Sequence, residues 1–264
     1  LLSKASQLDI PIASHAPQAL VAVATGDGQR APRRNFNADA VESHWFEFED
    51  RERCAIATAL LDNGVDINNS DDDDKGAVHW AAMRGYTNLL QLLISRKADV
   101  NVARNARGRT PLHEAVDGDV VRLLCKEGGA DLHKTDSLGA SALDTAAFEG
   151  RLEAVQALLH CRANIHQTRP NGGSALFMAT QNGHAAVVSV LLNAKAQVNQ
   201  RRVDNSVALT MACQNGHAEV AGLLVGAKAD VSNVWQGRSA VDHARSNGHT
   251  AVVDEILSRS GTTK

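Results

Sequence analysis

Thr110-Pro111-Leu112-His113-Glu114-Ala115 is the stretch that decides the fold of this chain. A threonine can cap a helix, a proline fits the first helical position, and Leu112 and Ala115 fall on one helical face. A second apolar group follows over residues 120–124, and Gly128-Gly129-Ala130-Asp131-Leu132 then stops the helix and begins a turn. The stretch therefore predicts two short helices joined by a turn.

The same pattern recurs along the chain in four separate parts. The leucine slot is filled by Val78, Leu112, Leu143, Leu176, Leu209 and Val241. The glycine that ends the first helix recurs as Gly85, Gly118, Gly150, Gly183, Gly216 and Gly248. A double-leucine slot follows at residues 92–93, 123–124, 158–159, 191–192, 223–224 and 256–257. A turn of the Ala-Asp-Val-Asn type comes next at residues 98–101, 130–133, 163–166, 196–199 and 229–232.

A period of about 33 residues, with two helices, a turn and a Thr-Pro-Leu-His start, resembles the ankyrin repeat. The two-helix unit follows from the spacing itself. The resemblance implies an all-α solenoid of about six to seven helix-turn-helix repeats, joined by β-turn or hairpin loops. Because each repeat buries its apolar face only against its neighbours, we treat the array as one domain.

We expect four segments along the chain. Residues 1–37 form an irregular N-terminal arm, in which residues 20–24 are the piece able to pack against the first repeat. Residues 38–74 form a degenerate capping repeat, with its first helix near residues 42–48 and Trp45 in the leucine slot. Residues 75–258 form the repeats and residues 259–264 a polar tail.

The composition excludes several classes of protein. The net charge of −3 argues against nucleic acid as a partner. No apolar run approaches the roughly 18 residues of a membrane span. The four cysteines contain no Cys-x-x-Cys pair, which favours free thiols and an intracellular, reducing compartment, cytoplasmic by default. The chain begins without methionine, so a fragment or a processed form with the remnant of an organelle-targeting segment is an alternative.

Several departures from the repeat pattern have physical consequences. Serine replaces threonine before the first helix at Ser141, Ser174 and Ser239, and serine still caps a helix. At the end of the second helix Gly64 and Gly129 suit a left-handed backbone, but the same slot elsewhere holds Lys97, Arg162, Lys195 and Lys228. A left-handed residue other than glycine costs about 1–2 kcal/mol, so we expect repeats of modest stability. The altered spacing over residues 101–118 predicts a bend or a partner contact there.

The sequence contains no pattern typical of catalysis, of a cofactor or of a metal site. The histidines at 184, 217 and 249 share one slot in separate repeats, where the resemblance implies hydrogen bonds between neighbouring turns; it implies the same for His79 and His113. The run Asp71-Asp72-Asp73-Asp74 lacks the spacing of a calcium loop, and Asp71 occupies a turn position. We therefore expect a protein that is not an enzyme.

The resemblance implies a concave surface made of first-helix ends and hairpin tips, and this surface supplies the candidate binding residues. They are Met83, Arg84, Arg104, Arg107, Arg109, Leu138, Phe148, Glu149, Asn171, Gln181, Asn182, Arg201, Arg202, Gln214, Asn215, Trp235 and Arg238. The resemblance also makes Asn68, Asn101 and Asn199 candidates for asparagine hydroxylation, although a turn asparagine bonded to its own loop is the simpler interpretation.

The leading hypothesis is a protein-binding or scaffold module whose arginine-rich face receives an acidic segment of a partner. The alternative is a structural spacer held permanently in a larger, organellar or membrane-associated complex by its N-terminal arm.

Overall fold

The computed structural model describes residues 19–25, 50–104 and 106–260. The chain divides into two compact units, residues 1–131 and residues 132–264, and each is described by itself. The first unit contains α2 (Ala19–Thr25), α4 (Asp50–Asp62), α5 (Ala77–Arg84), α6 (Thr87–Ser95), α7 (Pro111–Glu114) and α8 (Gly118–Lys126). The second contains α9 (Ala142–Glu149), α10 (Leu152–His160), α11 (Ala175–Gln181), α12 (Ala185–Asn193), α13 (Ala208–Asn215), α14 (Ala218–Gly226), β1 (Val234–Trp235), β2 (Arg238–Ser239), α15 (Ala240–Ser246) and α16 (Thr250–Ser260).

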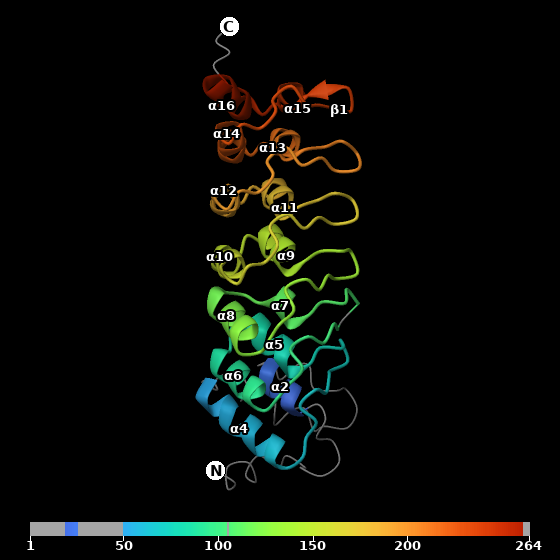
Figure 1. The fold of residues 1–264 in the computed structure, drawn as a ribbon, viewed down its shortest axis with the longest axis vertical. Coiled ribbons are helices and arrows are strands. Elements are labelled where there is room, and N and C mark those ends of the chain that lie inside the picture. Colours follow the sequence, from blue (N-terminus) through green and yellow to red (C-terminus); the bar gives the residue numbers. More distant parts are fainter. Residues whose placement is uncertain (1–18, 26–49, 105, 261–264) are drawn as a thin grey trace. The chain divides into compact units, whose positions relative to one another are not determined.

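The helices come in pairs, and we call the first member of each pair the inner helix and the second the outer helix. Within the second unit the inner helices α9, α11, α13 and α15 pack on one another in chain order, as do the outer helices α10, α12, α14 and α16. Figure 1 shows the inner helices of this unit between the outer helices and the projecting hairpin loops. The stack is an ankyrin-repeat solenoid, as the sequence predicts.

The core of the second unit is a thin apolar layer between the two rows of helices. Leu158, Leu191 and Leu224, which occupy the predicted double-leucine slot, are fully buried. Small residues such as Ala147 and Ala179 on the inner helices are equally buried and allow the helices to approach closely. Each repeat thus completes its core with its neighbour's side chains.

The serines that replace threonine do cap the inner helices. The Ser141 hydroxyl accepts a hydrogen bond from the backbone N–H of Asp144, and the Asp144 carboxylate accepts from the backbone N–H of Ser141 at 2.9 Å. Ser239 and Asp242 form the same reciprocal pair before α15. Both aspartates therefore serve helix starts and not acid–base chemistry.

An Asn-Gly-His clamp joins consecutive repeats of the second unit. The Asn182 amide and the His184 ring both donate to the backbone oxygen of Phe148 in the preceding repeat, at 3.0 and 2.9 Å. Asn215 and His217 do the same to Gln181, and Asn247 and His249 to Gln214. The structural role predicted for these three histidines is confirmed.

The cations at the corners after the outer helices adopt the left-handed conformation. Lys97, Arg162, Lys195 and Lys228 have φ of 63°, 68°, 70° and 66°. The backbone N–H of the residue after each cation donates to a helix carbonyl four positions before the cation, which closes the turn and holds this conformation. The left-handed conformation for which a cost of about 1–2 kcal/mol is expected is therefore present at all four positions.

The N-terminal repeat is built differently from the sequence prediction. Helix α2 packs against both α4 and α5, which is the place of an inner helix whose outer partner is α4. Leu20, Val21 and Val23 of α2 are buried in this contact. The sequence analysis gave that place to residues 42–48 and Trp45, which lie outside the described residues. Residues 19–25 of the predicted irregular arm are thus part of the stack.

Two further boundaries differ from expectation. Helix α7 has only four residues, because the repeat is shortened before Gly118, and Val116 donates its backbone N–H directly to Ala82 at 3.2 Å. Helix α16 continues to Ser260, so the boundary predicted for the polar tail at residue 259 falls inside a helix.

Candidate protein-binding surface

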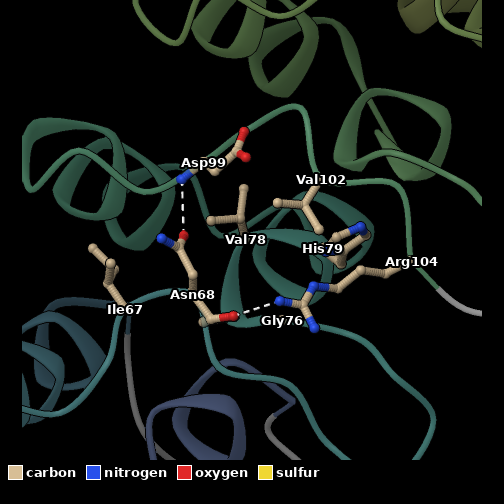
Figure 2. Close-up of a pocket in the computed structure, with 9 residues that line it drawn as sticks. Ile67, Asn68, Gly76, Val78, His79, Asp99, Val102 and Arg104 are labelled. Atoms are coloured by element: carbon tan, nitrogen blue, oxygen red, sulfur yellow. Dashed lines mark hydrogen bonds between the residues drawn. The ribbon is translucent and has the colours of Figure 1, made fainter.

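The hairpin base of the first unit contains a small pocket with mixed polar and apolar walls, large enough for about one water molecule (Figure 2). Arg104 lies across it and donates to the backbone oxygen of Asn68 at 2.6 Å, while its other terminal nitrogen pairs with Asp74 at 3.0 Å. The Asn68 side chain accepts from the backbone N–H of Asp99 at 2.9 Å. The pocket walls therefore serve mainly to join two repeats.

His79 lines the same pocket and is buried. Its Nε2 lies 3.2 Å from the backbone oxygen of Arg109 in the next repeat. Burial lowers the pKa of His79 from 6.5 to about 4, and the hydrogen bond to the Arg109 backbone opposes this only in part. The ring is therefore neutral at neutral pH, and it joins two repeats as predicted.

Acid should weaken the first unit through this histidine. The unfolded chain binds a proton at His79 below pH 6.5, whereas the folded chain does so only near pH 4. Above pH 6.5 the neutral His79 makes its full contribution to the free energy of unfolding of the first unit. This contribution falls by up to about 3 kcal/mol as the pH drops to about 4. We expect His79→Gln to reduce the slope of unfolding free energy against pH between 6.5 and 4, measured by urea unfolding. An unchanged slope would contradict this assignment.

Two arginines of the predicted binding face, Arg104 and Arg202, contact the preceding repeat. Arg202 lies over the Phe177 ring at 4.8 Å, with Phe177 in the preceding repeat, and it pairs with Asp204 at 3.3 Å. Arg169, which is not among the predicted binding residues, stands near the buried Asp144 of the preceding repeat. Burial raises the pKa of Asp144, and hydrogen bonds from Ser141 and the Arg169 charge oppose the rise.

Other arginines of that face are also engaged. Arg109 lies 3.8 Å from Glu114, and Arg238 donates to Ser246 at 3.2 Å. Arg84 lies over the Trp80 ring at 5.8 Å, and Arg107 also has an interaction partner. Arg201 is exposed, and its guanidinium donates to the Asn233 oxygen at 3.1–3.2 Å when the Asn233 amide takes its flipped orientation. Intramolecular contacts thus hold several arginines of this face, but Arg107, Arg201 and Arg238 are exposed, and an acidic partner segment at the hairpin tips stays a prediction.

Trp235 is the clearest correction among the candidate residues. Its side chain is 8% exposed and packs on His243, with the ring centroids 5.0 Å apart. His243 in turn has its Nε2 3.0 Å from the backbone oxygen of Trp235. The short β1–β2 hairpin turns the indole inward onto its own repeat, so Trp235 stabilises the last repeat and is not available to a partner.

In the second unit the predicted face exposes apolar and amide side chains beside the charged Glu149, Arg201 and Arg238. Leu138 is 63% exposed at a hairpin tip, and Phe148 is 43% exposed at the end of α9. Val203, which the sequence analysis did not select, is 77% exposed at another tip. The exposed amide candidates of this unit are Asn171, Asn182 and Asn215. Gln181 and Gln214 are half-buried, as is Met83 in the first unit.

The three asparagines considered for hydroxylation bond to the following repeat and not to their own loop. Asn101 accepts from Asp131 at 2.7 Å, and its amide donates to Gly129. Asn199 accepts from Asp230 at 2.8 Å, as Asn68 does from Asp99. At Asn68 and Asn101 the aspartate two residues earlier accepts the backbone N–H of the asparagine within the loop, Asp66 from Asn68 and Asp99 from Asn101. Hydroxylation of these residues stays a prediction.

Several other observations bear on the class of protein. Over residues 19–25, 50–104 and 106–260, the structure has no group of three His, Cys, Asp or Glu side chains suited to a metal. Within the same ranges no helix has the length and apolar character needed to cross a bilayer. The four cysteines, all within these ranges, form no disulfide bond, and burial raises the pKa of the Cys213 thiol to about 12.

These features define a stack of helical repeats with exposed side chains on its inner face, which is the architecture of a binding protein. The family model for ankyrin repeats, in three copies, matches residues 49–136, 143–234 and 176–264. The chain therefore belongs to the ankyrin-repeat family. That fold generally serves as a non-enzymatic protein–protein interaction module.

Parts of this chain are similar in sequence to parts of known proteins. The NF-kappa-B inhibitor cactus of Drosophila melanogaster is 35% identical over 81 residues, which is 30% of this chain and 16% of that protein. Serine/threonine-protein kinase 12 of Arabidopsis thaliana is 38% identical over 68 residues, 25% of this chain and 15% of that protein. The chain thus spans less than a fifth of either relative.

Among solved structures, the human ASB11 ankyrin repeat domain superposes with a TM-score of 0.71 at 26% identity. The match covers 81% of this chain and 96% of that one.

Proposed function

We propose that this protein is a scaffold that binds a protein partner through the inner-helix ends and hairpin tips of its second unit. The observation that carries the proposal is the exposure of Leu138, Phe148 and Val203, three large apolar side chains beside amides on that face. A partner that covers them gains about 25 cal/mol for each Å² of apolar surface removed from water. The amides of Asn171, Asn182 and Asn215 would form the polar rim.

The backbone around these side chains is preorganised for such a contact. Each of the three helix ends on this face is fixed by the Asn-Gly-His clamp of the following repeat, and the Asn171 backbone oxygen accepts from Val203 at 3.0 Å. A surface that is rigid before binding loses little conformational entropy on association, which favours affinity. The charged partner segment expected from the sequence is not needed at this face.

The alternative of a spacer anchored by the N-terminal arm is weakened by α2, since residues 19–25 already pack against the chain itself. We also propose an intracellular, reducing location, which the free cysteines support.

The proposal is tested by purifying tagged wild-type protein and a variant with Leu138→Asp, Phe148→Gln and Val203→Asp from the source cells. We expect specific partners to co-purify with the wild type and to be lost from the variant. The matched control is Glu153→Gln, Gln156→Ala and Glu219→Gln, which changes three exposed positions on outer helices. Equal recovery of the same partners with the variant and the wild type would overturn the proposal.

A further inference from the structure

The corners of the second unit carry a row of cations that the fold does not need. Arg162, Lys195 and Lys228, which we call the corner row, follow the outer helices α10, α12 and α14 at one position per repeat. All three side chains are exposed. Because consecutive outer helices pack side by side, the three charges recur about every 10 Å along one edge of the unit.

Each cation of the corner row occupies a backbone position that disfavours it. The φ values of 68°, 70° and 66° lie in the left-handed region, where glycine is unstrained and other residues are not. Gly129 and Gly64 show that the same turn forms with glycine in this chain. Asparagine, the side chain best tolerated after glycine, is absent from all of these positions. Proximity to a helix C-terminus favours a cation by less than the strain costs.

The side chains of the corner row also lack the carboxylate partners within the chain that several arginines of the unit have. Arg151 pairs with Glu149, Arg202 with Asp204 and Arg259 with Glu255. Within the described part of this unit, the three corner cations have no carboxylate at ion-pair distance. The turn that follows holds Asn164 and Gln197 where the repeat pattern has aspartate, which removes the nearest acids from two of the three corners.

We infer that the corner row binds an acidic segment of a protein partner. An acidic helix advances 1.5 Å per residue, so carboxylates seven residues apart match the spacing of one repeat. An extended polyproline II segment matches it with carboxylates three residues apart, because this helix has three residues per turn and rises 3.1 Å per residue. Nucleic acid is disfavoured, because one line of three charges offers few phosphate contacts and the residues beside the row are not aromatic. The inference rests on the proposed function and adds a second contact with the partner. This contact uses none of the residues of the proposed binding surface.

The experiment measures binding of a fluorescein-labelled, glutamate-rich peptide of about 20 residues, long enough to span three repeats in either form. Fluorescence anisotropy is recorded for the full chain and for the variant Arg162→Gly/Lys195→Gly/Lys228→Gly. We expect the variant to bind the peptide about tenfold more weakly, and wild-type binding to weaken from about 50 to about 200 mM salt. We also expect the Tm of the variant to rise by several degrees, since glycine relieves the strain.

The charge control is Lys134→Gln/Arg245→Gln/Arg259→Gln, which removes three exposed cations from the same unit and should leave peptide binding within about twofold of wild type. An equal loss with the control would overturn the inference, because net charge alone would then explain binding. A glycine variant that melts lower and binds the peptide normally would show that the cations serve stability. A single-stranded oligonucleotide bound more tightly than the peptide through the same three residues would also overturn it. None of these results depends on Leu138, Phe148 or Val203.

Discussion

Leu20→Asp should destabilise the first unit by about 4 kcal/mol or more. Leu20 is 1% exposed, and its helix α2 covers the inner face of α5 and the side of α4. The substitution removes a buried apolar side chain and places a carboxylate in its site, and each change alone costs several kcal/mol. Urea unfolding followed by circular dichroism should show an early transition, and hydrogen exchange should assign it to residues of the first unit.

The matched control for Leu20→Asp is Ala19→Asp, one position earlier in the same helix. Ala19 is half-buried at the first helical position, where a negative charge interacts favourably with the helix dipole. We expect a cost below about 1 kcal/mol. Equal costs for the two variants would show that α2 is not part of the stack.

The Arg53 side chain gives an independent reason to regard α2 as structural. It is 4% exposed, lies over the Tyr86 ring at 4.4 Å and donates to the backbone oxygen of Val23 at 3.0 Å. Loss of α2 would leave this buried charge without that acceptor. Deletion of residues 1–37 therefore damages the fold and is not a clean test of anchoring by the arm.

Gly183→Ala should cost about 2–4 kcal/mol, because it combines backbone strain with a steric clash. Gly183 has a φ of 75°, and a methyl group there would lie 2.6 Å from Nδ1 of His217. The ring would have to move, which removes its hydrogen bond to the Gln181 backbone. Urea unfolding of the variant and the wild type measures the cost.

Gly248 provides the matched control for Gly183. It occupies the same slot in the last repeat with a φ of 76°, but nothing lies within 4 Å of an added methyl group. Gly248→Ala should therefore show the backbone strain alone, about 1–2 kcal/mol. The difference between the two variants measures the clamp between repeats. If both cost the same, the clamp contributes nothing to stability.

The repeating part of the fold could be predicted from sequence because its signals are local. Leu176, the cap Ser174 and the stop Gly183 lie within ten residues of one another, and each favours the same helix. The left-handed conformation at Lys195 followed from the same register. The first repeat could not be assigned in this way, because its inner helix ends at Thr25 and its outer helix begins at Asp50. Sequence periodicity does not identify which apolar segment packs across so long a connection.

The sequence predicts where the proposed binding surface lies, but it does not predict which kinds of side chain are exposed there. The sequence does not show the partners of the hairpin arginines, because these partners lie far away along the chain. Asp74, which pairs with Arg104, is 30 positions earlier, and Phe177, which contacts Arg202, lies in the preceding repeat. Trp235 looks like an anchor, but the two-residue turn at Gln236 and Gly237 directs it onto His243. Val203 carries no motif, and only its 77% exposure makes it a candidate.

Site-specific photo-crosslinking tests the central claim most directly. A photoreactive residue placed at position 148, at the end of inner helix α9, should crosslink the partner in source cells. The same residue placed at the exposed position 156, on outer helix α10, should not. Crosslinks from position 156 and none from position 148 would contradict the proposed binding surface.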